Sequence, residues 1–232
     1  MKSVRFATIL LLSSLFAQAG LAQGEYVSLG TRIPDFPREY REMVKDVDAT
    51  DPASVAIAHQ AFTRCIAVHR VKQALPVLQL PLHSEEQFRA TADLFKQPQA
   101  CLGRDLSEMR VSAHLMVGGI AEAFVVNDPL LAAAVTSQPA LGSSELSELV
   151  GRTSMETVAI CAVRKEPAAV IALLRSDVRS QAELDALSLV ATDLGSCIPT
   201  GVEAKFDAAS LRALVANGAY LVAIASDAPG TS

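Results

Sequence analysis

The chain has 232 residues, of which 20 are Lys or Arg and 25 are Asp or Glu, so its formal net charge is −5. An acidic balance without basic clusters argues against nucleic acid and anionic membrane surfaces as partners. With no Trp, 8 Phe and 3 Tyr, the chain has few aromatic side chains that could stack on sugars or bases.

Residues 1–22 have the layout of a secretory signal peptide. Lys2 and Arg5 precede an apolar run at 6–16, and small residues follow it. We expect cleavage after Ala22 or after Ala19. The apolar run is shorter than the ~20 residues that span a bilayer, so we expect a periplasmic or secreted protein without stable membrane insertion after cleavage.

Residues 23–49 are expected to form an N-terminal lead-in, with a short extended stretch followed by a turn or two of helix. Residues 50–126 should then hold a first unit of four helices. The first helix follows Thr50 or Asp51 and ends near His69, and the second covers 71–80. Pro76 lies inside the second helix and should kink or shorten it.

The third helix is predicted from the capping box Ser84-Glu85-Glu86-Gln87, in which the hydroxyl and the amide side chain can satisfy backbone amides of a first turn. It should end before Pro98. The fourth helix lies in the apolar stretch 112–126, where Gly118 and Gly119 either break the helix or let it approach a neighbour closely. Glu122 in this stretch argues against a membrane span.

Residues 127–142 are predicted to connect the first unit to a second one at 143–226, and residues 227–232 to form a disordered tail. The second unit should contain four more helices: from Ser143 or Ser144 to about Arg164, from Pro167 to Arg175, from Ser180 to Gly195, and within 207–224. Arg212 lies inside the last of these stretches and argues against a membrane span.

The two units match at an offset of 96 residues. Cys65 and Cys101 are 36 residues apart, and so are Cys161 and Cys197. The capping box at Ser84 recurs 96 residues later, and apolar positions keep the same register behind both boxes. We therefore expect an all-α fold of two tandem repeats, each with about four helices and one disulfide within the repeat.

In an exported protein, four cysteines are expected to form disulfides. Four cysteines allow three pairings, and we favour Cys65–Cys101 with Cys161–Cys197 because a duplicated unit would keep its own bond. Each bond should disfavour the unfolded chain by roughly 3–4 kcal/mol. A four-cysteine zinc site and a redox role are the alternatives, but the closely spaced cysteine pairs typical of both are absent.

No catalytic constellation is recognised, so the catalytic residues stay unknown. None of His59, His69, His83 and His114 lies three or four residues from another, and no metal site or cofactor is predicted. His59 and His69 are expected to be partly exposed on the surface. Basic residues near the cysteines, such as Arg64, could mark an anion-binding face, although solvated surface explains them more simply.

One group of motifs supports a family resemblance: Cys161-Ala-Val-Arg-Lys-Glu-Pro167, Leu173-Leu174, Cys197, Leu211-Arg212 and Ala219-Tyr220. On these motifs the chain resembles small, uncharacterised exported proteins of alphaproteobacteria that have a duplicated, cysteine-paired helical unit. The resemblance extends over residues 51–224, although the first copy has Val71 where the second has Pro167. It implies a helical fold and export, and it brings no activity with it.

The sequence therefore favours an exported helical protein with a non-enzymatic binding or structural role, whose partner is an unknown protein or small molecule. A small exported enzyme, such as a hydrolase, is the alternative. An enzyme would need a concave pocket where His or carboxylate side chains converge with perturbed pKa values.

Overall fold

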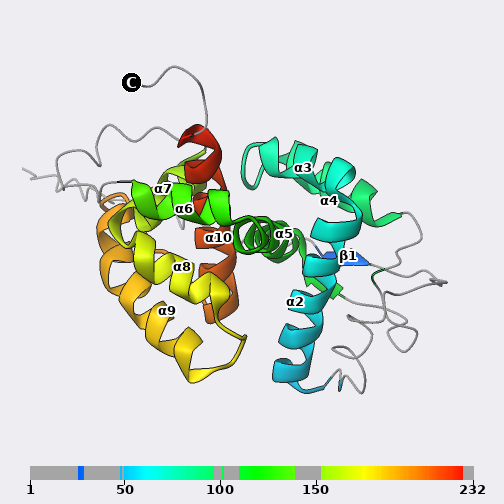
Figure 1. Cartoon of the computed structure of the whole chain (residues 1–232), viewed down its shortest axis with the longest axis horizontal. Helices are drawn as coiled ribbons and strands as arrows, with labels where there is room; N and C mark the ends of the chain where they lie inside the picture. Colours follow the sequence, from blue (N-terminus) through cyan, green and yellow to red (C-terminus); the bar gives the residue numbers. More distant parts are fainter. Residues whose placement is uncertain are drawn as a thin grey trace, which may run out of the picture.

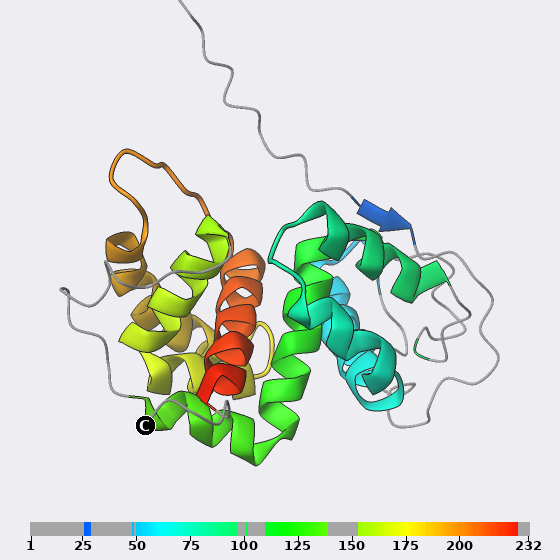
Figure 2. The ribbon, with the colours of Figure 1, turned by 90° about the horizontal axis from the view of Figure 1, so that it is seen from above.

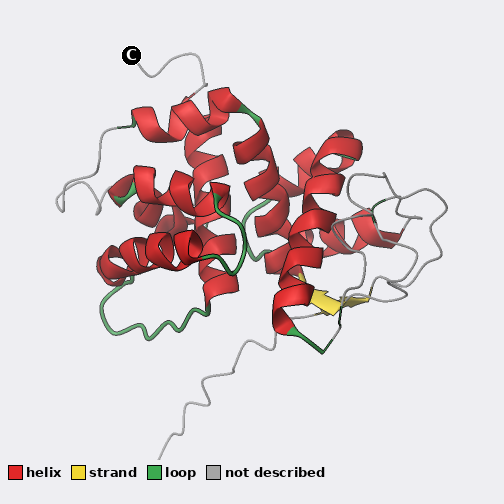
Figure 3. Cartoon of the chain, turned by 60° about the horizontal axis from the view of Figure 1, so that its bottom comes forward, coloured by secondary structure: helices red, strands yellow, loops and turns green. Residues whose placement is uncertain are grey.

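The computed structural model describes residues 26–28, 48, 50–96, 101, 110–138 and 153–226. In this part of the chain it has nine α-helices, one short 3-10 helix and one two-stranded ribbon (Figure 3). The prediction of a mostly helical fold is therefore confirmed. The predicted signal peptide, most of the predicted lead-in and the tail at 227–232 lie outside the described residues.

The helices follow one another with short connections. The first group is α2 (Pro52–His69), α3 (Val71–Gln79) and α4 (Glu85–Lys96), followed by α5 (Ala113–Asn127) and α6 (Pro129–Ser137). The second group is α7 (Ser154–Lys165), α8 (Pro167–Arg175), α9 (Gln181–Leu194) with the 3-10 turn η2 (Gly195–Cys197), and α10 (Ala208–Ser226). The strands β1 (Tyr26–Ser28) and β2 (Arg110–Ser112) pair antiparallel.

A parallel pair of apolar helices, α5 and α10, forms the centre of the molecule (Figures 1 and 2). At one end of the pair, Nε2 of His114 is 3.4 Å from Oγ of Ser210. At the other end, the ring centroids of Phe124 and Tyr220 are 6.3 Å apart. Helices α2, α3 and α4 lie on one side of the pair and α7, α8 and α9 on the other, so a first and a second group of helices share this core.

Helix α5 runs without a break through Gly118 and Gly119, because both glycines allow a close approach. A Cβ on Gly118 would overlap the Cβ of Ala213 in α10, and one on Gly119 would lie 2.7 Å from Oγ1 of Thr63 in α2. Neither position leaves room for a side chain. Gly118 therefore sets the spacing between α5 and α10, and Gly119 that between α5 and α2.

The structure has one helix that the sequence did not predict, and one helix begins later than predicted. The predicted connector at 127–142 contains α6, because the Asp128 side chain accepts a hydrogen bond from the amide of Leu130 and Pro129 is suited to a first helical turn. Helix α7 begins at Ser154 with Thr153 as its N-cap, later than predicted. The expected caps Ser143 and Ser144 lie outside the described residues. Pro76 is accommodated inside α3.

The stretch Ala208–Ala225 of α10 is long and apolar enough to cross a membrane, and 67% of it is buried within the fold. Helices α5, α6 and α7 pack against it. In this structure α10 is therefore the central core helix.

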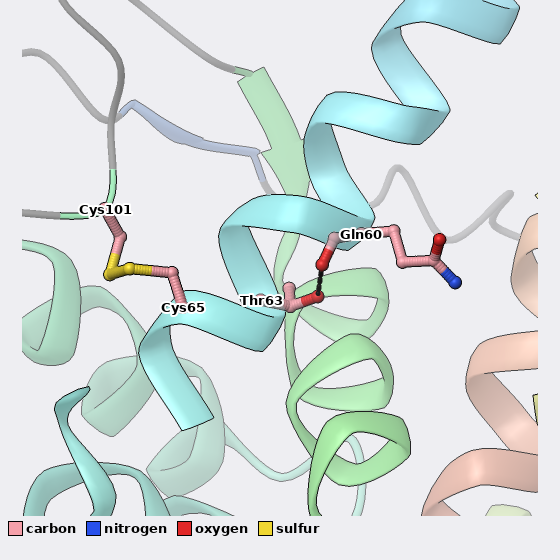
Figure 4. Close-up of a disulfide and its surroundings, with 4 residues drawn as sticks. All are labelled: Gln60, Thr63, Cys65 and Cys101. Atoms are coloured by element: carbon pink, nitrogen blue, oxygen red, sulfur yellow. Dashed lines mark hydrogen bonds between the residues drawn. A yellow bond between two sulfur atoms is a disulfide. The ribbon is translucent and has the colours of Figure 1, made fainter. Parts of the chain in front are cut away.

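Two disulfides fasten the helices, Cys65–Cys101 and Cys161–Cys197, with Cα–Cα distances of 5.5 and 5.7 Å. This is the pairing that the equal spacing favoured. Figure 4 shows the first bond on one side of α2, while the Gln60 side chain points away from it, and Thr63 donates a hydrogen bond to the Gln60 carbonyl. Two disulfides indicate an oxidising, extracellular environment.

Candidate functional site

A cavity of about 1010 Å³ lies between the two groups of helices, at the N-terminal ends of α5 and α10. Five helices line it with residues in or next to their first turns: Pro52 for α2, Ser84 for α4, Ala113 for α5, Glu183 for α9 and Ala208 for α10. A cavity of this size can hold a drug-sized molecule. We call it the central cavity.

Two left-handed residues lie on its walls. His83 has a φ of 63° and Arg179 a φ of 68°, and both residues line the central cavity. The amide of His83 donates to Oε1 of Gln87 at 3.0 Å, and that of Arg179 donates to Oε2 of Glu183 at 2.6 Å. The two turns before α4 and α9 thus have the same geometry. In each turn, the side chain of the third helical residue accepts a hydrogen bond from the amide of the residue that precedes the Ser cap.

The predicted capping hydroxyls form their bonds in both turns. Oγ of Ser84 accepts a hydrogen bond from the amide of Gln87, and Oγ of Ser180 accepts one from that of Glu183, each at 3.1 Å. Because the caps fix where α4 and α9 begin, they also place Gln87 and Glu183 at the cavity wall.

A buried ion-pair cluster lies beneath the central cavity. Arg212 in α10 donates from Nε and Nη2 to the two carboxylate oxygens of Glu122 in α5, at 2.7 and 2.9 Å. Its Nη1 donates to Glu183 in α9 at 2.8 Å. Gln60 in α2 donates to the same Glu122 at 2.8 Å. The cluster therefore ties α2, α5, α9 and α10 together in the interior.

The remaining hydrogen bonds of Arg212 go to Ser176 and to the carbonyl of Leu174. Burial alone would lower the pKa of Arg212, but the hydrogen bonds and negative charges of Glu122 and Glu183 outweigh it and raise that pKa above its ordinary value. Arg212 is thus a permanently charged group with its donor groups engaged inside the protein.

Three of the four histidines line the central cavity: His59, His83 and His114. The rings of His83 and His114 lie 5.5 Å apart. Burial, assisted by neighbouring His114, lowers the pKa of His59 to about 4, and burial also lowers the pKa of His83 and of His114. These imidazoles are therefore uncharged at neutral pH.

His59 is partly exposed, as expected, but it lines the central cavity. Its Nε2 atom is buried and has no hydrogen-bond partner in the described part of the chain. Spacing within one helix gives no sign of this group, because His59, His83 and His114 come from three different segments. His69 is exposed and does not line the cavity, as expected for a surface residue.

The first turn of α5 lines the cavity and has no side-chain cap. Its N-cap residue, Ser112, makes no side-chain capping bond. The backbone amides of Ala113, His114 and Leu115 have no helical acceptor in a first turn, and none is bonded elsewhere among the described residues. The other four helices at the cavity are all capped by side chains, namely Asp51, Ser84, Ser180 and Asp207.

The four cysteines do not line the central cavity. Of the basic residues near them, Arg64 lies 4.0 Å from Glu122 at the edge of the ion-pair cluster. Within the described ranges, no group of three or more His, Cys, Asp or Glu side chains is arranged to hold a metal ion.

No family model, no curated protein and no solved structure matches this chain. The central cavity and its residues are therefore the basis for a functional proposal.

Proposed function

We propose that this chain is an exported protein that binds a small molecule in the central cavity without transforming it. The observation that carries this proposal is the cavity of about 1010 Å³ with a largely apolar lining. His59, His83 and His114 converge on it with lowered pKa values, which an enzyme would also need, so an enzyme is kept below as the second candidate. A purely structural role would favour a filled interior, because protein cores are close-packed. A largely apolar cavity with a few polar groups is typical of small-molecule sites.

We also infer that residues 50–126 and 143–226 are two copies of one unit. The two disulfides span the same number of residues, and the left-handed residues occupy corresponding positions. Contacts between corresponding positions also occur on the central helices, as expected where two copies pack around a shared twofold axis. These contacting pairs are His114 with Ser210 and Phe124 with Tyr220.

Duplication gives the central cavity a simple origin. His83 and Arg179 line it from the two groups of helices, so it lies where the two copies meet. The copies have different side chains at these corresponding positions. An ancestral symmetric site could thus have become specific for one asymmetric ligand.

The export part of the proposal is supported by the signal-like segment at 1–22 and by the two disulfides. Expression of the full chain in a bacterial host, followed by cell fractionation and N-terminal sequencing, tests it. We expect the processed chain outside the cytoplasm, beginning at Gln23 or Gly20. An unprocessed cytoplasmic chain would contradict export.

The binding part can be tested with N-phenyl-1-naphthylamine, an uncharged dye that fluoresces in apolar surroundings. We expect saturable binding, which Ala56→Phe should abolish because Ala56 lines the cavity and the larger side chain would fill it. The control is Ala172→Phe, at an exposed position of α8 away from the cavity. Dye binding that is absent, or equal in both variants, would refute the proposal.

A hydrolase is the second candidate, and one contact favours it. Oγ of Ser210 lies 3.4 Å from Nε2 of His114 at the cavity, which is the pair that a serine nucleophile and its base would form. However, Asp207 bonds the amide and the hydroxyl of Ser210 as a helix cap, instead of orienting the imidazole. Binding therefore explains the geometry better.

Hydrolysis of p-nitrophenyl butyrate, together with labelling by a fluorophosphonate, separates the two candidates. The binding proposal predicts no turnover above that of Ser210→Ala. Turnover or covalent labelling that Ser210→Ala removes would establish the hydrolase instead.

A further inference from the structure

One buried hydrogen bond between the two groups of helices has no counterpart at the corresponding positions. The amide of Leu82, in the turn before α4, donates to Oε1 of Glu156 in α7 at 2.9 Å, and both residues are 2% exposed. At an offset of 96 residues, Val178 corresponds to Leu82 and Gln60 to Glu156. Val178 and Gln60 both line the central cavity and are not bonded to each other. The cavity therefore lies where the second of two equivalent links is missing.

The turns that carry these two amides have the same shape. In 81–84 and in 177–180 the amide of the last residue donates to the carbonyl of the first, at 3.0 and 3.1 Å. Only the third residue of each turn has a positive φ, 63° and 68°, which is the geometry of a type II turn. The amide of Leu82 is bonded, whereas that of Val178 has no acceptor in the described residues.

Gln60 offers the matching acceptor on the cavity wall. It is 8% exposed, and its side-chain nitrogen donates to Glu122 at 2.8 Å. Because a carboxylate only accepts, the NH₂ group must face Glu122, and the carbonyl oxygen of the side chain is left over. That oxygen accepts no hydrogen bond within the described ranges, and unlike Nε2 of His59 it is not sealed from the cavity. A donor on a ligand can therefore reach it.

The charged groups of the wall are already engaged. The ion-pair cluster uses its charges internally. Asp207 accepts from the amide of Ser210, and Arg179 is close enough to Asp51, the N-cap of α2, to interact with its carboxylate. The three imidazoles are uncharged at neutral pH. A charged ligand would lose its hydration without gaining a partner of opposite charge, so the wall favours an uncharged one.

We propose that the ligand is an uncharged carboxamide with an apolar body. Its N–H donates to the side-chain carbonyl of Gln60, and its carbonyl accepts from the amide of Val178. The apolar body lies against the part of the wall that Val55, Phe88 and Leu115 line. The ligand thus supplies the link that Leu82 and Glu156 make directly. This inference rests on the proposed binding function and adds the class of ligand.

Two amides with the same chain test the donor at pH 7, by displacement of N-phenyl-1-naphthylamine. Octanamide has N–H groups, and N,N-dimethyloctanamide has none. We expect octanamide to bind ~10-fold more tightly or better, because the dimethyl compound leaves the Gln60 carbonyl unpaired. Apolar burial alone would give the opposite order, since the two methyl groups add apolar surface.

Two charged compounds of the same length test the absence of a charge requirement. Octanoate carries a negative charge and octylamine a positive one at pH 7. We expect both to displace the dye less well than octanamide. Tighter binding of either ion would overturn the assignment of an uncharged ligand.

Two variants locate the polar group. Gln60→Met keeps an unbranched side chain without the carbonyl and should remove the preference for octanamide over its dimethyl analogue. Val178→Pro removes one amide at the second position of the turn, where type II turns favour proline. We expect it to lower octanamide affinity ~3-fold or more, because it deletes one hydrogen bond to the ligand.

Two further prolines serve as matched controls. Ser154→Pro, at the first position of α7 outside the cavity, should leave the affinities for both amides unchanged. Leu82→Pro removes the corresponding amide, which is bonded to Glu156, and should destabilise the fold in urea denaturation, whereas Val178→Pro should not. Equal destabilisation by both would show that the amide of Val178 is already bonded within the protein, which would overturn the inference.

The outcomes separate the two proposals. Dye binding without a preference for octanamide, or a preference that persists in Gln60→Met, overturns the carboxamide inference and leaves the binding function standing. Unchanged octanamide affinity in Val178→Pro does the same, and this variant decides alone if circular dichroism shows that Gln60→Met is unfolded. Failure of the dye and of both amides to bind overturns both proposals.

Discussion

Arg212 and Glu122 form a bidentate ion pair in the centre of the molecule, with N–O distances of 2.7 and 2.9 Å. The two residues are 90 positions apart in the chain and belong to the two central helices, α5 and α10. Their side chains are 7% and 6% exposed, so each charge depends on the other for its stability.

Replacement of Arg212 by Met should therefore strongly destabilise the fold. It leaves the carboxylates of Glu122 and Glu183 buried without their cation, and we expect a loss of about 3–5 kcal/mol in the free energy of unfolding. Urea denaturation measures it. The triple variant Arg212→Met, Glu122→Gln, Glu183→Gln carries no buried charge at these positions and should regain most of the loss. A single variant as stable as the parent would contradict the role of the cluster.

The disulfides should contribute separately to stability. Replacing Cys65 and Cys101 by Ser, or Cys161 and Cys197 by Ser, should each lower the unfolding free energy by about 3–4 kcal/mol, because either bond closes a loop of 36 residues. Denaturation with and without reductant measures this effect. Peptide mapping under non-reducing conditions checks the pairing, and a Cys65–Cys161 bridge would contradict it.

Acidification should destabilise the protein through His59. The pKa of His59 falls from 6.5 to about 4 on folding, so the unfolded chain binds a proton that the folded chain does not. Stability is unaffected above pH 6.5, decreases as the pH falls below it, and levels off near pH 4, with a total loss of about 3 kcal/mol. His83 and His114 shift in the same direction.

Unfolding free energies measured between pH 7.5 and 5 test this dependence. That pH range lies above 3.8, the ordinary pKa of an aspartate. The pKa values of Asp51 and Asp207 are lowered below it, so the stability that these two carboxylates contribute is lost only at lower pH. His59→Gln should show a flatter profile than the parent. An equally steep profile in both proteins would show that His59 is not the group responsible.

The glycines of the central helices should resist substitution. In Gly218→Ala the new Cβ would lie 2.5 Å from the Ala159 carbonyl oxygen, and Gly118→Ala would meet Ala213 in the same way. We expect each to cost about 1–3 kcal/mol despite the better helix propensity of alanine.

Gly195→Ala is the control for these two variants, since a Cβ at this position would have no neighbour within 4 Å and the backbone there is right-handed helical. It should be neutral or stabilising in thermal denaturation. Equal effects at all three sites would contradict the packing argument.

Local signals in the sequence predicted most helices well. Asp51, Ser84 and Ser180 cap α2, α4 and α9 where expected, because a cap acts on amides two or three residues away. The same local rules missed α6, which Asp128 caps inside the predicted connector, and placed the start of α7 before its cap at Thr153.

The candidate site could not be found this way. Glu122 and Arg212 were noticed only as charges that interrupt apolar stretches, and the sequence contains no sign that they meet. The histidines of the site come from α2, from the turn before α4 and from α5, so no spacing within one helix links them.

By itself the amino-acid sequence determined the helical class, the helix starts that strong caps define, and the equal spacing of two cysteine pairs. Those properties depend on neighbours a few residues away or on composition. Only the tertiary structure decided that α5 and α10 run side by side, that Arg212 neutralises Glu122 and Glu183, and that the first turn of α5 faces a cavity. These depend on long-range packing, where glycines such as Gly118 set how closely two helices approach.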